Sequence, residues 1–101
     1  CDNEENSFQA KEENDGGYPA SVQGQNNYIH DLMQAVVDVP DQRGKGIFYW
    51  EPTWIAVPGN TWATPAGMKY IHDEWKEGNA RENQALFDCQ GKVLPAVKVF
   101  N

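Results

Sequence analysis

Three residues of this chain could do chemistry together: Trp50, Glu51 and Trp54, which lie within five positions of one another. A carboxylate such as Glu51 can act as a general acid or base, and indole rings offer flat apolar faces to a ligand. The preceding β-forming residues predict a strand over residues 46–51, buried on both faces as in a parallel sheet and ended by Pro52. The three side chains would then lie at the carboxyl end of that strand, where parallel α/β folds place their binding sites.

A second chemical pattern lies near the start of the chain, where Asp2, Glu4 and Asn6 alternate with other residues. Oxygen ligands at every second position allow a loop to wrap around a hard cation such as Ca²⁺. The alternative is an ordinary solvated loop, because residues 1–18 are acidic and polar and close on two glycines. We therefore expect an acidic loop over residues 1–18, with cation binding as one of its two interpretations.

A helix is predicted over residues 19–40, with Ser21 as its N-cap and Pro40 as its end. Its polar side carries His30, which we interpret as an exposed residue. A short turn then leads into the predicted strand, so helix, turn and strand form one step of a parallel α/β architecture. Such a step needs a parallel neighbour strand before the helix, and none is evident in the sequence. The apolar positions recur at helical spacing: Val22, Ile29, Leu32, Met33, Val36 and Val37.

Residues 52–82 form a long, irregular, aromatic-bearing loop, in which residues 68–76 could make a short helix. His72 has no second metal ligand at a suitable spacing, so we interpret it as an ordinary residue. Residues 83–101 contain a turn and then a final helix that Pro95 opens.

Composition limits the classes of protein that this chain could be. Its 101 residues allow one small domain, and 40% hydrophobic content is sufficient for a core. A net charge of −7 argues against a nucleic-acid partner, and no apolar run reaches membrane-spanning length. The two cysteines, Cys1 and Cys89, could pair in an oxidising compartment or remain free thiols. Cys1 could also be the lipid-modified first residue of a surface lipoprotein.

Taken in order along the chain, four blocks resemble the endo-β-1,4-galactanases of glycoside hydrolase family 53. The most specific are the Tyr-Trp-Glu-Pro-x-Trp block at residues 49–54 and the Asn-Gln-Ala-Leu-Phe-Asp block at residues 83–88. The other two blocks are residues 18–25 and the Leu-Pro pair at 94–95. The order and spacing agree with the family, so the resemblance covers nearly the whole chain.

The resemblance implies the C-terminal fragment of a (β/α)₈ TIM barrel, comprising helix 7, strand 8, a long loop and helix 8. It also implies a parent enzyme that hydrolyses β-1,4-galactan, the galactose polymer of pectic side chains, with retention of configuration. Retaining glycosidases use two carboxylates, and in this family both glutamates would precede Cys1. The isolated chain is therefore expected to be inactive, and Glu51 is not expected to be catalytic.

Three residues of the strand end receive roles from the resemblance. Trp50 corresponds to a strand-8 tryptophan that lines the sugar-binding cleft, and Trp54 and Glu51 are candidate substrate contacts, Glu51 as a hydroxyl acceptor or as a structural carboxylate. A structural Ca²⁺ site is also implied, with one half at Asp2, Glu4 and Asn6 and the other at Asn79 and Glu82. Glu4 stands where the family has histidine, and the first aspartate of the family's run is absent.

Further expectations concern partners and location. The resemblance implies galactan or its oligosaccharides as ligand and a secreted, periplasmic or cell-surface protein. A lone strand 8 would leave both of its edges unpaired, so the chain alone should self-associate or need the upstream barrel. The alternative function is a non-catalytic carbohydrate-binding or surface module, lipid-anchored if Cys1 is modified.

Overall fold

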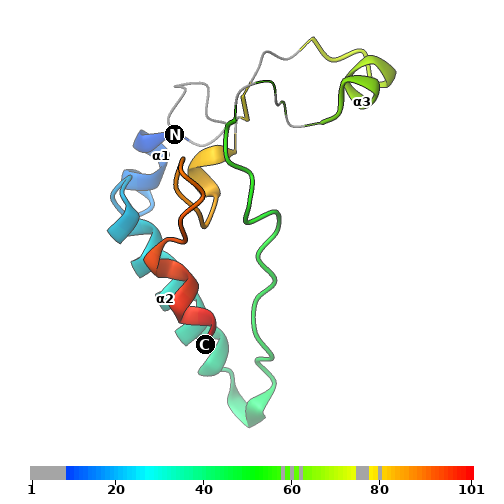
Figure 1. Ribbon diagram of the computed structural model, residues 1–101. Coiled ribbons are helices and arrows are strands. Elements are labelled where there is room, and N and C mark those ends of the chain that lie inside the picture. Colours follow the sequence, from blue (N-terminus) through cyan, green and yellow to red (C-terminus); the bar gives the residue numbers. More distant parts are fainter. Residues whose placement is uncertain (1–8, 58, 60, 62, 75–77, 80) are drawn as a thin grey trace. The chain divides into compact units, whose positions relative to one another are not determined.

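The computed structural model describes residues 9–57, 59, 61, 63–74, 78–79 and 81–101. These residues form two compact units, one made of residues 9–50 and 93–101 and the other of the described residues between 51 and 92. The first unit contains α1, α2, η1 and η3, and the second contains α3 and η2 (Figure 1). None of the described helices has both the length and the apolar character needed to cross a membrane.

The helix predicted over residues 19–40 forms as α2, Val22–Val37, which begins three residues later and ends three residues earlier than predicted. Ser21 is its N-cap as predicted, because the Ser21 hydroxyl accepts a hydrogen bond of 3.0 Å from the Gly24 N–H. The chain leaves α2 at Asp38 and continues into the 3₁₀ helix η1, Pro40–Gln42. Proline at the first position suits this new helical turn but could not continue α2.

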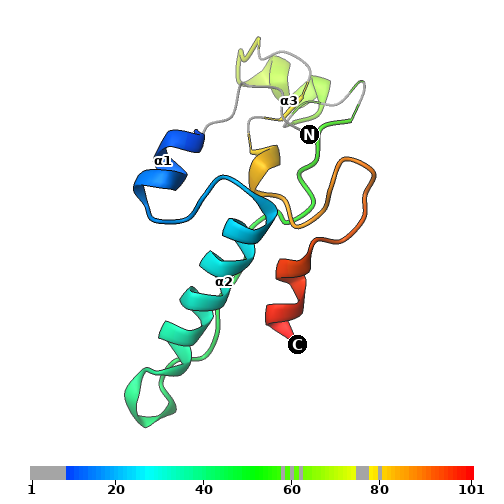
Figure 2. The ribbon, with the colours of Figure 1, turned by 90° about the vertical axis from the view of Figure 1, so that its left-hand side faces the viewer.

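The core of this unit lies between α2 and the last helix, η3, Pro95–Phe100, which lie side by side in Figures 1 and 2. Ile29 of α2 and Ala96 of η3 are almost fully buried. Pro95 opens the final helix as predicted, although its turns are 3₁₀. The small side chain of Ala96 is compatible with close contact between the two helices.

Two glycines permit close backbone contacts to α2. A Cβ atom on Gly24 would lie 1.8 Å from the Pro19 carbonyl oxygen, and one on Gly44 would lie 1.7 Å from the Val36 carbonyl oxygen. Both distances are far below van der Waals contact, and the opposing atoms belong to the backbone, so they cannot rotate away. The absence of a side chain at these two positions therefore allows the segments before and after α2 to approach the helix closely.

The acidic loop predicted over residues 1–18 contains a helix, α1, Ala10–Asp15, which corrects part of that prediction. The Glu12 carboxylate accepts a hydrogen bond of 2.8 Å from the Gln9 N–H, as in a capping box, and Lys11 pairs with Asp15 one turn later. No residue of α1 is buried. Local capping and charge pairing account for this helix without any apolar stripe, which explains why hydrophobic spacing did not indicate it. Residues 1–8 lie outside the described residues.

The strand predicted over residues 46–51 is not formed among the described residues. Residues 44–50 run as an extended chain with no hydrogen-bonded ladder, following the end of η1 in Figure 1. The prediction of burial on both faces is also wrong, because Phe48 is 86% exposed and Trp50 is 71% exposed. A strand requires a neighbour for its N–H and C=O groups, and the rest of the described chain supplies only isolated bridge positions at Phe87 and Val93.

The second unit contains the loop predicted over residues 52–82. Its short helix is α3, Pro65–Tyr70, which begins three residues earlier than predicted. The earlier start follows from Thr64, whose hydroxyl caps the helix by accepting a hydrogen bond from the Gly67 N–H. The 3₁₀ helix η2, Glu82–Gln84, follows, and a turn joins Asp88 to Lys92. Ala85 and Leu86 are buried together with the polar residues Asn79 and Glu82.

We predict that Gly24→Ala destabilises the first unit, because its methyl group must displace the backbone at Pro19. The expected loss of unfolding free energy is about 1–3 kcal/mol, the usual range for an overpacked site. Urea denaturation followed by circular dichroism of α2 measures this loss. Gly16→Ala is the milder comparison, because its Cβ would lie 3.3 Å from the Glu13 carbonyl oxygen, a tight contact that a shift of a few tenths of an ångström relieves. Equal stability of the two variants would show that the backbone at Pro19 can move away from the added methyl group without cost, and it would contradict the prediction.

Candidate functional site

Along residues 47–50, half-buried side chains alternate with exposed ones. Ile47 and Tyr49 are half-buried, whereas Phe48 and Trp50 are exposed. The Tyr49 ring makes an edge-on contact with Phe100 of η3, with ring centroids 6.4 Å apart, and burial raises the pKa of Tyr49 above its ordinary value. Because successive side chains of an extended chain point to opposite faces, Phe48 and Trp50 belong to the face that the helices do not cover.

The two exposed rings form a tilted aromatic pair, with centroids 6.0 Å apart and an angle of 49° between their planes. This distance lies within the range of favourable ring–ring contacts. Phe48 therefore supports one side of the Trp50 ring, which remains mostly accessible. The sequence prediction identified Trp50 but missed Phe48, although the period-two spacing of the two rings was a signal that could have found it.

Glu51 and Trp54 lie on a turn of the second unit. Glu51 is exposed and has a φ of 52°, in the left-handed region that residues with a side chain rarely adopt. The Trp54 N–H donates to the Glu51 carbonyl at 3.4 Å, and the Ile55 N–H donates to the Thr53 carbonyl at 2.8 Å. We call residues 51–55 the Glu51 turn. Trp54 itself is half-buried.

One hydrogen bond joins the Glu51 turn to a distant part of the sequence. The Leu86 N–H donates to the Pro52 carbonyl at 2.7 Å, and the Leu86 residue is buried. This contact lies immediately after η2, in the Asn-Gln-Ala-Leu-Phe-Asp block. The two blocks that first indicated a family are thus in direct backbone contact within the second unit, a relation that the sequence alone did not reveal.

Of the five predicted metal ligands, the described residues include Asn79 and Glu82, whereas Asp2, Glu4 and Asn6 lie outside them. Asn79 is 3% exposed and Glu82 is 5% exposed. The Glu82 N–H donates to the Asn79 carbonyl at 3.0 Å, and the Asn79 side-chain oxygen accepts from the Arg81 N–H at 2.9 Å. Within the described part of the chain, no three His, Cys, Asp or Glu residues gather as a metal site would require.

The hollow beside α3 is a further feature of the second unit. It is lined by residues before α3, within it and at its end, among them the apolar Met68 and the polar Thr61, Lys69 and Asp73. Its remaining lining residues are Gly59, Ala63, Thr64, Pro65 and Glu74.

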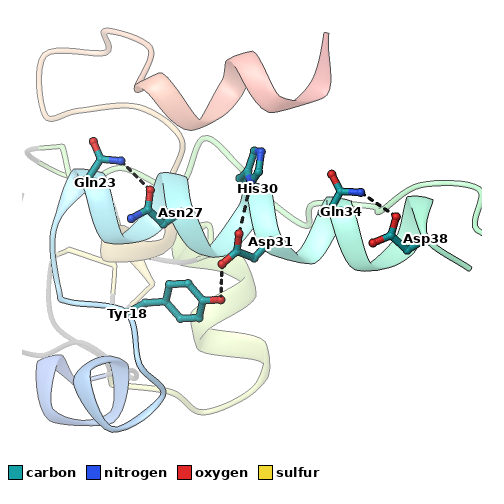
Figure 3. Close-up of polar contacts among 7 residues, drawn as sticks. All are labelled: Tyr18, Gln23, Asn27, His30, Asp31, Gln34 and Asp38. Carbon is teal, nitrogen blue, oxygen red and sulfur yellow. Dashed lines mark hydrogen bonds and ion pairs between the residues drawn. The ribbon is translucent and has the colours of Figure 1, made fainter.

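Figure 3 shows a row of polar contacts along the exposed face of α2, which includes His30. Asp31 accepts a hydrogen bond of 2.9 Å from the Tyr18 hydroxyl and lies 3.2 Å from Nδ1 of His30. Contact with His30, and secondly with Tyr18, lowers the pKa of Asp31 below its ordinary value. His30 is therefore an exposed surface residue, as predicted. Gln23–Asn27 and Gln34–Asp38 complete the row with ordinary i,i+4 hydrogen bonds.

His72 and Cys89, which the sequence analysis also discussed, belong to the second unit. His72 is exposed and has a φ of 55°. Cys89 is disulfide-bonded. The sequence holds one other cysteine, Cys1, outside the described residues.

Comparisons with known proteins give a consistent result. A family model described as glycosyl hydrolase family 53 matches residues 1–100. An endo-β-1,4-galactanase of Bacillus subtilis is 39% identical over 101 aligned residues, which cover 82% of this chain and 23% of that protein. An arabinogalactan endo-β-1,4-galactanase of Humicola insolens is 39% identical over 57 residues, covering 50% of this chain and 17% of that protein.

A solved structure supports the same relation. The catalytic domain of an Ignisphaera aggregans GH53 protein is 44% identical to this chain, and the two structures superpose with a TM-score of 0.73. The match covers 95% of this chain and 24% of that domain. The chain thus spans about a quarter or less of the length of each of these relatives.

We predict that Tyr18→Phe raises the pKa of Asp31 toward its ordinary value, because it removes the hydroxyl donor while the His30 contact remains. A carboxyl with a lowered pKa adds stability at pH values above its unfolded-state pKa and loses it as the pH falls through the folded-state pKa. Tyr18→Phe should therefore shift this loss to higher pH. Carboxyl-carbon NMR titration of Asp31 measures the change, with Gln34→Leu as a control that leaves Asp31 untouched. An unchanged Asp31 titration in Tyr18→Phe would contradict the assignment.

Proposed function

The chain belongs to glycosyl hydrolase family 53, and on this premise we propose that it is the C-terminal segment of an endo-β-1,4-galactanase. The parent enzyme would cleave β-1,4-galactan with retention of configuration. Retention requires a nucleophile and a general acid/base carboxylate about 5–5.5 Å apart. Both would come from the part of the barrel that precedes this segment, so the segment supplies a wall of the substrate cleft and none of the reacting groups.

The observation that carries this proposal is the exposure of Trp50 on the uncovered face of residues 47–50. Its neighbour Tyr49 packs toward η3, so the opposite face is left for the interior of a barrel. In (β/α)₈ enzymes the carboxyl end of a strand faces the active site. Trp50 would therefore offer its indole face to the C–H face of a galactosyl ring, with Phe48 supporting it from one side.

Glu51 and Trp54 would contribute less directly than Trp50 to binding of the sugar. Glu51 is exposed and carries a carboxylate that can accept hydrogen bonds from sugar hydroxyls. Its left-handed backbone and the bond from Leu86 to Pro52 restrict where the carboxylate can reach. Trp54 is a further candidate for contact with the sugar. Neither residue is assigned a catalytic role.

We also propose that Asn79 and Glu82 form half of a structural calcium site. Their chemistry fits, because Ca²⁺ prefers carboxylate and amide oxygens, and a buried carboxylate such as Glu82 is characteristic of ion-paired or metal-binding positions. The Asn79 oxygen that accepts from Arg81 has a second lone pair for a cation. Asp2, Glu4 and Asn6 would supply the other half. A bound Ca²⁺ would neutralise these carboxylates and cross-link two loops.

The proposed location is outside the cytoplasm, in a secreted, periplasmic or cell-surface protein. The disulfide at Cys89 supports this, because disulfides persist mainly in oxidising compartments. The proposed ligand is galactan or a galacto-oligosaccharide. Without the rest of the barrel, the uncovered face of residues 47–50 should make the chain self-associate.

The test of the parent activity is a chimera in which this chain replaces the matching segment of the Bacillus subtilis enzyme. We predict that the chimera releases reducing ends from β-1,4-galactan, while the 101-residue chain alone releases none and is not a monodisperse monomer. Reducing-sugar assays and light scattering measure the two properties. A folded chimera without hydrolysis would favour the non-catalytic binding alternative, and hydrolysis by the chain alone would overturn the assignment of the catalytic pair.

We predict that Trp50→Ala in this chimera lowers kcat/KM by at least about tenfold, the value expected from losing roughly 1.4 kcal/mol of ring–sugar contact. Trp50→Phe should retain part of the activity, because a smaller aromatic face remains. Tyr28→Ala serves as the control, since it removes an aromatic ring from α2 on the helix side of the unit. Equal kcat/KM values for Trp50→Ala and the control would refute the platform role.

We predict that Ca²⁺ raises the thermal unfolding temperature of the chimera and that Glu82→Gln reduces this effect. A ligand at one hundred times its Kd stabilises the folded state by about 2.7 kcal/mol. Differential scanning fluorimetry in CaCl₂ and in EGTA measures the shift, with Gln84→Ala as a matched control in η2. The calcium proposal fails if the unfolding temperature is the same in both solutions.

A further inference from the structure

Residues 47–50 make a ring contact on each of their two faces. On the face toward the helices, the Tyr49 ring meets the Phe100 ring edge-on, with centroids 6.4 Å apart and an angle of 88° between the planes. On the uncovered face, the Phe48 and Trp50 rings lie 6.0 Å apart with their planes at 49°. All of these residues belong to the first unit, so the two contacts have a defined relation to one another.

The contact at Tyr49 is anchored on the core of the first unit. Phe100 is the last residue of η3, which lies against α2. Ala96 of η3 and Ile29 of α2 are no more than 1% exposed. Close-packed segments leave little free volume for adjustment, so the position of η3 is well defined. Burial also raises the pKa of Tyr49, which agrees with a ring held against the helix and not in water.

The orientation of Trp50 is tied to that of Tyr49 by the geometry of an extended chain. Successive side chains of such a chain point to opposite faces. A rotation of residues 47–50 about their own axis that withdrew Tyr49 from η3 would therefore turn Trp50 through a similar angle. Among the described residues, no hydrogen-bonded ladder along 44–50 resists this rotation. Side-chain packing thus carries a larger share of the orientation than it would in a paired strand.

We propose that Tyr49 is a positioning residue for Trp50. Its edge-on contact with Phe100 fixes the rotation of residues 47–50, and so the direction in which Trp50 presents its indole face to the sugar. Tyr49 itself makes no contact with the sugar in this assignment. The inference rests on the proposed function, since it takes Trp50 as the sugar platform. It goes further by assigning the final helix, η3, a part in orienting that platform.

The test is a double-mutant cycle in the galactanase chimera, with β-1,4-galactan as substrate. Tyr49→Leu removes the ring, whereas Tyr49→Phe keeps the ring and removes only the hydroxyl group. Each variant is measured with Trp50 present and in the Trp50→Ala background. Tyr18→Leu is the matched control, because it removes another edge-on ring contact of the first unit, that with Tyr28 at 5.3 Å.

We expect Tyr49→Leu to lower kcat/KM about threefold to fivefold, mainly through a higher KM, because an indole turned away from the sugar loses binding contact while the reacting groups are unchanged. Tyr49→Phe and Tyr18→Leu should keep kcat/KM within about twofold of the unmodified chimera. In the Trp50→Ala background, Tyr49→Leu should cause no further loss, since residues that act through one interaction are not additive.

Fluorine NMR of the chimera labelled with 5-fluorotryptophan gives a direct readout of the indole. The Trp50 resonance, identified by its loss in Trp50→Phe, should shift or broaden in Tyr49→Leu and stay in place in Tyr49→Phe. Where Tyr49→Leu does not fold, Phe100→Leu removes the same ring contact from the side of η3 and takes its place in both measurements.

The contrary outcomes separate this inference from the proposed function. A loss in Trp50→Ala with no loss in Tyr49→Leu, or an additive loss in the double variant, would overturn the positioning role and leave the sugar platform in place. An equal loss in Tyr18→Leu would assign the effect to general stability and would also overturn the positioning role. An unchanged kcat/KM in Trp50→Ala itself would reject the platform and, with it, this inference.

Discussion

An extended segment needs hydrogen-bonding neighbours, and residues 44–50 have no ladder among the residues that the structure describes. This constraint accounts for much of what surrounds the segment. One face is held by packing, through Tyr49 against Phe100, and the other exposes Phe48 and Trp50. An exposed aromatic pair on an unpaired segment is unfavourable in a self-sufficient domain. It is compatible with a family-53 chain that spans only about a quarter of the length of its relatives.

Local sequence signals predicted those elements whose ends depend on local contacts. Ser21 caps α2 and Pro95 opens η3 as predicted, because each acts through its own backbone or through a residue three positions away. Pro40 was predicted to end the first helix, but α2 already ends at Val37 and Pro40 opens η1 instead. The helix α1 was missed because its determinants are a capping box and an ion pair, which hydrophobic spacing does not detect. The strand prediction failed for a different reason, since β-forming residues cannot supply the partner that a ladder requires.

The candidate site was only partly accessible from the sequence. Trp50, Glu51 and Trp54 were selected from their types and spacing, and the exposure of Trp50 agrees with a role in ligand contact. Asn79 and Glu82 were assigned from family resemblance, and their burial is compatible with the proposed half-site. The bond from Leu86 to Pro52 could not have been predicted, because it joins residues far apart in sequence through main-chain atoms that every residue possesses. Periodicity and composition do not encode such a contact.

The central claim is that the uncovered face of residues 47–50 presents Trp50 to a sugar. A crystal structure of the chimera with a bound galacto-oligosaccharide tests it most directly. The account predicts that the Trp50 indole lies flat against the C–H face of a galactosyl ring, with Phe48 on the same side and Tyr49 against η3. A bound sugar that makes no contact with Trp50, or an indole that packs against the helices, would contradict the account.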